Sequence, residues 1–417
     1  MLKPPGYTSA LIGRPKGSGG STDRNNDRQK QAPSISKMLD TVRAFDWAGL
    51  LALSVWLYLL AFRGRFWIAR PAVLPGKAPE PAPRITVIIP ARNEAAVVGR
   101  AVASLVRQDY PGEFRIFLVD DQSEDGTAEV ARQCAGPERL EVVRGTPPPA
   151  GWVGKVWAME QGVRAAASRG DGYILFTDAD IVHGKGDLRK LVSHAAQARC
   201  DLASLMVKLR CETAAERMLI PAFVYFFFML YPPRWAASAH RRTAGAAGGC
   251  MLVNRAALER AGGLESIRGE LIDDCALARR MKQTGGAVWL GLADSARSIR
   301  EYGTFGDVVS MIARSAYTQL RYSTALLAVA LAGMFVTYLL PPVLAIAVRP
   351  PAAWLGACAW LLMAVTYAPM LRYYGKSFLW APLLPATACV YLWATLLSAL
   401  RWRRGEGAAW KGRAGVR

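Results

Sequence analysis

The chain of 417 residues is 52% hydrophobic and carries 52 Lys and Arg against 32 Asp and Glu, a formal net charge of +20. Seven cysteines are scattered without a Cys-x-x-Cys pair, which argues against a disulfide framework and a zinc site and fits a reducing cytoplasm. The sequence has no basic stripe with interleaved aromatic residues. The positive charge therefore indicates attraction to anionic lipid and phosphorylated ligands, and we expect no nucleic acid as partner.

The amino-terminal region combines a polar tail with an apolar stretch. Residues 1–40 are rich in Gly, Ser, Pro, Lys, Arg and Asn, so we expect disorder there and hypothesise that Met38 is the native start. The uncharged stretch Trp47 to Phe62 predicts a transmembrane helix over 45–66. Basic residues follow this helix and place the next domain on the cytoplasmic side: Arg63, Arg65, Arg70 and Lys77.

Three further uncharged stretches predict three transmembrane helices over 324–400, the first of them kinked at Pro341-Pro342. A cytoplasmic domain followed by three spans would leave the basic tail 401–417 outside, although it holds six Lys or Arg. Either the positive-inside rule is overridden here, or one apolar block is re-entrant or miscounted. The three stretches are Thr324 to Val348, Ala352 to Leu371 and Phe378 to Leu400.

A shorter apolar run, Met218 to Tyr231, is stopped by Pro232-Pro233 and is too short to span a bilayer comfortably. One interpretation is a buried core helix. The other is an interfacial segment in the headgroup plane, with nearby arginines meeting lipid phosphates. Those arginines are Arg234, Arg241 and Arg242.

Between 84 and 315 short β-rich runs alternate with helical stretches, which predicts an α/β domain with a mainly parallel, twisted sheet. Strands are expected at 84–90, 115–119 and 173–176, and a helix at 95–108. A polar cluster follows each of these strands. Because the carboxyl ends of parallel strands open on the same edge of a sheet, the three clusters are expected to line one crevice.

The third cluster contains Asp178 and Asp180, separated by one alanine. Two carboxylates at a strand end repel each other unless a cation lies between them, and oxygen ligands suit Mg2+ or Mn2+ with a substrate phosphate. The alternative is a solvated turn. His183, three residues further on, is either a third metal ligand or a surface residue.

Three motifs in this order resemble family 2 glycosyltransferases. They are Val-Ile-Ile-Pro-Ala-Arg-Asn-Glu (87–94), Leu-Val-Asp-Asp-Gln-Ser-Glu-Asp-Gly-Thr (118–127) and Thr-Asp-Ala-Asp (177–180). The resemblance covers roughly 84–300 and implies an inverting enzyme with a GT-A fold and a nucleotide-sugar donor. The flanking apolar stretches further resemble those of the hopene-associated glycosyltransferases, which are similar to ceramide glucosyltransferases.

The resemblance also implies roles for the motif residues. Asn93 and Glu94 would lie against the nucleotide. Asp121, together with Asp120, would accept hydrogen bonds from the edge of the uracil base. Asp178 and Asp180 would hold the ion that bridges the two donor phosphates and neutralises the leaving group. Asp125, beside Gly126, is instead expected to be a cap or turn residue.

Other candidate residues lie outside these motifs. Similar enzymes carry the Gly154-Lys155 pair, so Lys155 either touches the donor or begins a solvated helix. Gly248 and Gly249 suit a loop whose backbone approaches a sugar closely, because glycine has no side chain to block it.

Asp273 and Asp274 begin a predicted helix, where either carboxylate alone could simply serve the helix dipole. In the family that the sequence resembles, the final acid of such a pair is the general base, which favours Asp274.

Arg321 lies in a stretch similar to the Gln-x-x-Arg-Trp element of membrane-bound relatives. Thr318 and Tyr322 replace the Gln and Trp of that element, which disfavours processive synthesis; Arg321 either contacts a phosphate or flanks the bilayer.

Together these features predict an integral protein of the inner (cytoplasmic) membrane with a cytoplasmic, metal-dependent GT-A domain. The predicted reaction transfers one sugar from a UDP-sugar to a lipid hydroxyl, with a hopanoid or ceramide-like lipid as the favoured acceptor. The lipid is inferred because apolar segments flank the site. The alternatives are a processive polysaccharide synthase and a non-catalytic membrane scaffold that retains the fold.

Overall fold

The computed structural model describes residues 35–406, 409–410 and 413–414. The predictions for residues 1–34 and for residues 407–408, 411–412 and 415–417 of the basic tail therefore lie outside the described residues. The predicted disorder is wrong for residues 35–40, which begin a helix. The chain divides into two compact units, Met1–Phe45 and Asp46–Arg417. Helix α1 (Ile35–Ala61) begins in the first unit and continues into the second, which contains the sheet.

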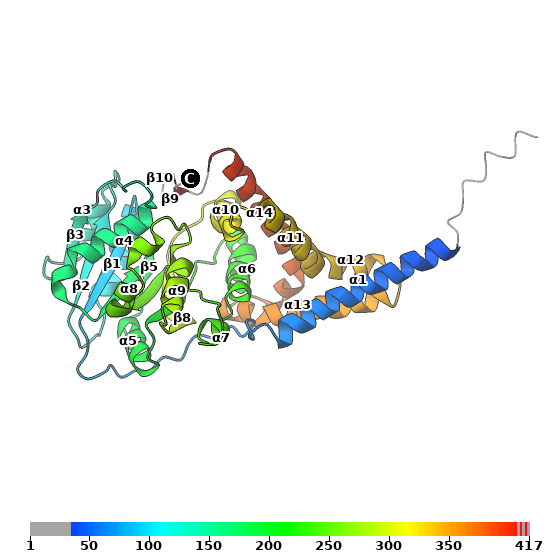
Figure 1. Ribbon diagram of the computed structural model, residues 1–417, viewed down its shortest axis with the longest axis horizontal. Coiled ribbons are helices and arrows are strands. Elements are labelled where there is room, and N and C mark those ends of the chain that lie inside the picture. The colour runs from blue at the N-terminus through cyan, green and yellow to red at the C-terminus, as the bar shows by residue number, and fades with distance from the viewer. Residues whose placement is uncertain (1–34, 407–408, 411–412, 415–417) are drawn as a thin grey trace, which may run out of the picture. The chain divides into compact units, whose positions relative to one another are not determined.

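An eight-stranded sheet with the order β3-β2-β1-β4-β7-β6-β8-β5 organises the second unit (Figure 1). The first four strands in this order run parallel, with Ile85 of β1 opposite both Phe114 of β2 and Tyr173 of β4. Strand β7 runs antiparallel to both of its neighbours, and β5 is antiparallel to β8. The strands are β1 (Ile85–Ala91), β2 (Phe114–Asp120), β3 (Leu140–Arg144), β4 (Tyr173–Thr177), β5 (Ile181–Val182), β6 (Leu202–Lys208), β7 (Cys250–Asn254) and β8 (Val288–Ser298).

Helices cover both faces of this sheet, because successive side chains of a strand point to opposite faces. In β1, Val87 and Ile89 pack in one core cluster with α2, α3 and α5, whereas Ile88 packs in another with α4, α8 and α9. The predicted strands and the helix after β1 are thus confirmed, with ends shifted by one or two residues. The six helices are α2 (Ala95–Val106), α3 (Thr127–Arg132), α4 (Gly154–Ala165), α5 (Asp187–Gln197), α8 (Arg255–Arg260) and α9 (Asp273–Gln283).

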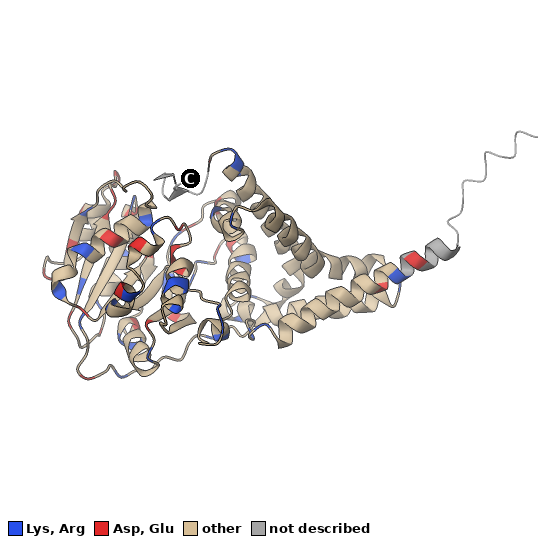
Figure 2. Cartoon of the chain, in the orientation of Figure 1, with Lys and Arg blue, Asp and Glu red and all other residues tan. Residues whose placement is uncertain are grey.

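Charged side chains gather on the sheet-bearing part, whereas the remaining long helices carry few (Figure 2). Among the residues that the structure describes, five helices are long and apolar enough to cross a membrane, by length and composition. A π-helical turn, η3, directly precedes Pro341-Pro342, where the sequence predicts a kink. The segments are α1, α6 (Ala214–Leu230) with α7 (Pro233–Ala236), α11 (Thr324–Met334) with η3 (Phe335–Leu339) and α12 (Leu340–Ala347), α13 (Ala352–Tyr373), and η4 (Phe378–Leu383) with α14 (Leu384–Arg403).

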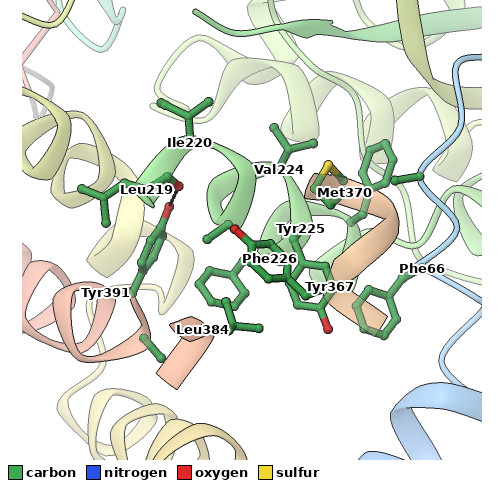
Figure 3. Close-up of a cluster of buried hydrophobic side chains, with 14 of the residues drawn as sticks. Phe66, Leu219, Ile220, Val224, Tyr225, Phe226, Tyr367, Met370, Leu384 and Tyr391 are labelled. Carbon is green, nitrogen blue, oxygen red and sulfur yellow. Dashed lines mark hydrogen bonds between the residues drawn. The ribbon is translucent and has the colours of Figure 1, made fainter. Parts of the chain in front are cut away.

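Helix α6 corresponds to the short apolar run, but it begins at Ala214 and is therefore longer than the run itself. Its aromatic side chains pack against α13 and α14 in one buried cluster (Figure 3). Within this cluster the Tyr225 hydroxyl lies 2.8 Å from Thr366 Oγ1, and the Tyr391 hydroxyl donates to the Leu219 carbonyl at 2.9 Å. The structure agrees with a buried helix, because α6 is packed among other apolar helices.

Helix α10 (Phe305–Gln319) connects the sheet to the apolar helices. The chain reaches it directly from β8, and Thr304 and Asp307 form a capping box at its start. Its side chains Val308 and Ile312 join the same cluster as α6. The sheet and the apolar helices are therefore packed together through α10 and α6.

Close packing of α4 on β1 gives a stability test. A Cβ atom on Gly162 would lie 2.6 Å from Ile88 Cγ2, closer than packed atoms approach. Gly162→Val should therefore lower the free energy of unfolding by about 1–3 kcal/mol, the usual cost of overpacking. Thermal unfolding in detergent measures the change. Ala165→Val, at an exposed position of the same helix, is the matched control, and an equal effect of both variants would contradict this packing.

Candidate functional site

The loops that follow β1 and β2 are tied together by hydrogen bonds. Asn93, which adopts a positive φ of 51°, donates its backbone N–H to Ser123 Oγ at 2.9 Å. Asp125 accepts from the backbone N–H of Ala95 at 2.9 Å and from that of Thr127 at 3.1 Å. Burial alone would raise the pKa of Asp125, but these hydrogen bonds, with that of the Thr127 hydroxyl, lower it. The prediction of Asp125 as a cap or turn residue is confirmed.

The two aspartates at the end of β2 occupy different environments. Asp121 is fully buried, and its backbone oxygen and its carboxylate both lie near the guanidinium of Arg92. Asp120 is half-buried, and its carboxylate accepts the backbone N–H of Ser123 at 3.1 Å. Asp120 thus shapes the loop, whereas Asp121 lies buried at its base.

Lys155, at the start of α4, lies between two aspartates from different parts of the chain. Its Nζ atom is 3.0 Å from Asp178 Oδ1 and 3.4 Å from Asp273 Oδ2. Burial alone would lower the pKa of Lys155, but the charges of Asp178, Asp273 and Asp274 outweigh burial and raise it. The side chain is only 16% exposed, so the predicted alternative of a solvated helix start is wrong. The structure thus brings the Asp178 motif and the Asp273-Asp274 pair together around one lysine.

Asp274 lies beside this lysine at the first turn of α9. Its carboxylate accepts the backbone N–H of Gly248 at 2.8 Å and that of Cys275 at 2.7 Å, which fixes its orientation. Burial and the charge of Asp273 raise the pKa of Asp274 to about 6, against the lowering effect of Lys155. A carboxylate with a pKa in this range can accept a proton near neutral pH.

Asp180, the second aspartate of the motif, has partners other than Lys155. Its Oδ2 atom accepts from the Ser298 hydroxyl at 2.6 Å and lies 3.3 Å from Arg300 Nε. The same arginine donates from Nη2 to Glu94 Oε1 at 2.6 Å. Arg300 therefore connects the loop after β1 with the loop after β4. Arg300 was not predicted from the sequence, because it follows a long strand and no recognisable motif surrounds it.

His183 is buried, with its Nε2 atom 2.9 Å from Thr177 Oγ1 and its backbone N–H bonded to Ser104. Burial lowers the pKa of His183 to about 4, although the charge of Asp187 acts in the opposite direction. The predicted alternative of a surface residue is therefore wrong. In the described part of the chain, no three His, Cys, Asp or Glu side chains are grouped as a potential metal site. The structure thus does not bring His183 together with Asp178 and Asp180 in this way.

The remaining candidates are placed differently from one another. A Cβ atom on Gly248 would lie 3.0 Å from Lys155 Nζ, so this glycine lies directly at the site. The carbonyl of Gly249 accepts from the Thr177 hydroxyl at 2.8 Å, which makes Gly249 part of the sheet edge. Arg321 is exposed after the end of α10, with a positive φ of 51°. Its described backbone hydrogen bond is to Thr318, so the structure does not bring it to the Lys155 cluster.

The ends of α6 and α10 approach the Asp274 side of the site. Gln319, the last residue of α10, donates to the hydroxyl of Tyr231, the residue that follows α6. That hydroxyl also interacts with Cys275 and, electrostatically, with Asp274. Neither Tyr231 nor Gln319 was predicted as a site residue. Tyr231 ends the run interpreted as a buried or an interfacial helix, and Gln319 lies in the stretch in which Arg321 was the candidate.

The fold and the site define a class of protein. Acidic clusters lie at the carboxyl ends of β1, β2 and β4, the edge at which open α/β sheets bind their ligands. One part of this site offers carboxylates for an ion, and the other offers a carboxylate that can accept a proton. This combination suits transfer of a group from a phosphorylated donor to an acceptor with an exchangeable proton.

Part of the chain matches a known protein family. Residues 86–262 match the model of Glycosyl transferase family 2. A 4,4'-diaponeurosporenoate glycosyltransferase of Staphylococcus aureus strain USA300 is 33% identical over 124 residues, which cover 30% of this chain and 31% of that protein. The protein of strain bovine RF122 / ET3-1 is 32% identical over the same length. The match thus spans about a third of the length of these curated relatives.

A solved structure extends the likeness to the fold. The mannosyltransferase PcManGT from Pyrobaculum calidifontis, in complex with GDP-Man and Mn2+, matches 86% of this chain and 99% of its own. The TM-score is 0.53 and the sequence identity is 21%. Residues 86–262 thus form a domain of the glycosyltransferase family 2 type, and the sheet-bearing domain has the GT-A fold.

The hydrogen bonds of Asp125 allow a test of how the loops after β1 and β2 are held together. Asp125→Ala removes the acceptor for the N–H groups of Ala95 and Thr127 and should lower the free energy of unfolding by about 1–3 kcal/mol. Chemical unfolding measures the change. Glu129→Ala, which removes an exposed carboxylate two residues into α3, should have an effect within about 0.5 kcal/mol of zero. Equal effects of the two variants would contradict the bridging role of Asp125.

Proposed function

We propose that this protein is a metal-dependent, inverting glycosyltransferase that moves one sugar from a UDP-sugar to the hydroxyl of a membrane lipid. A hopanoid or ceramide-like lipid is the acceptor that we propose, in line with the resemblance to hopene-associated enzymes. The main support is Lys155, which lies within 3.4 Å of carboxylates from both the Asp178 motif and the Asp273-Asp274 pair. Donor phosphates and the reacting sugar carbon are thereby brought close to one base.

The donor is proposed to lie along the ends of β1, β2 and β4. Asn93, Glu94 and Asp121 would surround the nucleotide, with Asp120 holding the loop in shape. The positive φ of Asn93 and its bond to Ser123 support a loop whose backbone is preformed for this contact. Gly248 lies so close to Lys155 that a Cβ atom would come within 3.0 Å of Nζ, and its lack of a side chain would allow the sugar to approach the backbone closely.

The residues present fit a divalent ion. Lys155 contacts Oδ1 of Asp178, and Ser298 and Arg300 contact Oδ2 of Asp180, so each carboxylate keeps its other oxygen for coordination. Mg2+ and Mn2+ take one or two carboxylates together with substrate phosphates and water, so a third protein ligand is not required. When bound, such an ion would neutralise the diphosphate that leaves.

Asp274 is proposed as the general base. The acceptor hydroxyl oxygen attacks C1 of the sugar, the bond from C1 to the phosphate oxygen breaks, and its electron pair leaves with the nucleoside diphosphate. The hydroxyl proton passes to the Asp274 carboxylate. The hydrogen bonds from Gly248 and Cys275 support this role, because they hold the carboxylate in one orientation.

A lipid acceptor is supported by the elements next to the base. Tyr231 and Gln319 end two helices that pack among the candidate membrane spans, and their side chains meet beside Cys275. A hydroxyl of a lipid in the bilayer could therefore reach Asp274 along α6 and α10. The Staphylococcus aureus relative, whose name specifies 4,4'-diaponeurosporenoate, a lipid-related molecule, gives further support.

The contacts of two apolar helices support a particular membrane topology. Helix α6 lies between β6 and β7, which pair with each other, so both of its ends must lie on the same side of the membrane. The last apolar block, η4 with α14, is proposed to be re-entrant for a similar reason. Contacts at the two ends of this block support re-entry. Lys376, just before the block, donates to the carbonyl of Cys211, and Arg401, near the end of the block, contacts Ser310 of α10.

The depth of this re-entrant block can be estimated. Trp360 of α13 donates to the carbonyl of Pro382, and it lies about 20 Å along the helix from Tyr373 at a rise of 1.5 Å per residue. A bilayer core is about 30 Å thick, so the block would turn back before crossing. Three crossings then remain, α1, α11–α12 and α13. The tail after Arg403 would return to the cytoplasm together with the catalytic domain, in agreement with the positive-inside rule.

The raised pKa of Asp274 gives a prediction for the pH dependence of transfer. The base is active when deprotonated, so kcat should rise with pH through about 6 and level off above it. Lys155→Met should shift this midpoint to higher pH, because it removes a positive charge that lowers the pKa. Asp273→Asn should shift the midpoint to lower pH. Rates of transfer from a radiolabelled UDP-sugar to extracted lipid, measured across the pH range, test the direction of both shifts of the midpoint.

Asp274→Asn is the accompanying control for the role of the base. It should lower kcat by at least about a hundredfold, the usual contribution of a general base, and leave UDP binding unchanged. Transfer by Asp274→Asn at the rate of the parent protein would overturn the proposed mechanism.

The topology prediction can be tested by proteolysis of oriented vesicles. A protease-cleavable tag after Arg417 should be accessible on the same side as a tag inserted after Gly170, in the catalytic domain. A third tag, placed after Arg349 between α12 and α13, should be accessible from the opposite side. Accessibility of the Arg417 tag together with the Arg349 tag would instead mean that α14 crosses the membrane.

A further inference from the structure

Arg300 holds two carboxylates that belong to different parts of the donor site. Its Nη2 atom lies 2.6 Å from Glu94 Oε1 and its Nε atom 3.3 Å from Asp180 Oδ2. Both acidic side chains are less than 10% exposed, whereas that of Arg300 is 31% exposed. A cation thus already occupies one oxygen of Asp180, and it remains accessible from the crevice.

The backbone around Arg300 is anchored on both sides. Before it, the N–H of Ile299 donates to the carbonyl of Asp180 at 3.0 Å, and after it the N–H of Tyr302 lies 3.4 Å from Glu216 Oε1. The guanidinium itself is attached through a long, flexible stem, so it can change partners while the backbone stays in place. Displacement of Arg300 from Asp180 therefore requires only a change of side-chain conformation.

Guanidinium and divalent cations compete for the same carboxylate oxygens, and guanidinium binds phosphate as well as carboxylate. An ion that reaches the site alone must separate Arg300 from Asp180 without offering the guanidinium a new partner. An ion that arrives with a nucleotide diphosphate brings phosphate oxygens to which Arg300 can move. The ion then replaces Arg300 at Asp180 while Arg300 moves to a phosphate, so both the carboxylate and the guanidinium keep a partner of opposite charge.

We propose that Arg300 is a resident counter-ion of the donor site, which holds Asp180 and Glu94 until a metal-bound nucleotide diphosphate displaces it onto a donor phosphate. This inference rests on the proposed function. It makes Arg300 a positioning residue for the ion and a ligand of the donor. It also gives an order of binding, because the ion enters readily only together with the nucleotide.

The consequence is a coupling between nucleotide and metal affinity, which must be reciprocal. In the full-length protein without nucleotide, Mn2+ should bind weakly, and UDP should strengthen its binding. Because Arg300 occupies an oxygen of Asp180, removing the guanidinium removes a competing cation and should improve the affinity of Asp180 for Mn2+.

Mn2+ binding to detergent-solubilised protein, followed by electron paramagnetic resonance of the free ion, tests this without any measurement of activity. Arg300→Gln should bind Mn2+ in the absence of nucleotide at least about tenfold more tightly than the parent protein, and UDP should add less to its affinity. Arg300→Lys keeps the positive charge and should resemble the parent. Arg260→Gln, which breaks an exposed ion pair with Asp201 away from the site, is the matched control and should also resemble the parent.

A second variant, Glu94→Gln, is expected to change the Mn2+ affinity in the opposite direction. It keeps the test valid if Arg300→Gln does not fold. Glu94→Gln removes one of the two carboxylates of Arg300, which leaves Asp180 as its charged partner among the ion pairs described here. Its affinity for Mn2+ without nucleotide should therefore fall below that of the parent protein.

The outcomes separate this inference from the proposed function. Tighter Mn2+ binding by Arg300→Gln, with weaker binding by Glu94→Gln, supports the counter-ion role. Equal or weaker binding by a folded Arg300→Gln overturns it, even if metal and UDP bind together in the parent. Failure of the parent to bind Mn2+ with UDP present would overturn the proposed metal site, and the counter-ion role with it.

Discussion

The site depends on the pairing of its acidic side chains with two cations, Lys155 and Arg300. Unit charges about 4 Å apart interact by about 4 kcal/mol where the effective dielectric constant is near 20, so carboxylates gathered in a half-buried crevice cannot stay charged without compensation. Lys155 compensates Asp178 and Asp273, and Arg300 compensates Asp180 and Glu94. In the proposed mechanism this arrangement divides the site into a donor half and a base half, which share Lys155 as their boundary.

This division explains why the catalytic parts come from distant segments of the chain. The parallel strands β1, β2 and β4 place the nucleotide and metal motifs at one edge, as the order of the sheet requires. After α6, the Gly248 loop returns the chain to the same edge, where the antiparallel strand β7 begins, and α9 places Asp274 next to this loop. The proposed lipid acceptor would therefore meet the base where α6 and α10 end, and the donor would meet it from the strand ends.

Much of the fold and part of the site could be predicted from the sequence. The strands before the three acidic motifs have strong alternating or apolar patterns, and Asp125 beside Gly126 has an unmistakable turn signature. Arg300 could not be predicted, because its role arises from the approach of β8 to two loops distant in sequence. The burial of His183 was equally inaccessible, since a lone histidine near a loop carries no signal for the Thr177 hydroxyl that it meets. For the last apolar block, composition indicates a span, and only the contacts of η4 with α13 and of α14 with α10 support the proposed re-entry.

The central claim is that one crevice transfers a single sugar to a membrane lipid, and the product tests it most directly. The purified full-length protein, supplied with radiolabelled UDP-sugars, Mn2+ and a total lipid extract, should yield a labelled glycolipid whose mass exceeds that of its acceptor by one sugar residue. Asp178→Ala and Asp274→Asn should abolish this product. A long polysaccharide, or equal labelling of lipid by the parent and both variants, would contradict the account.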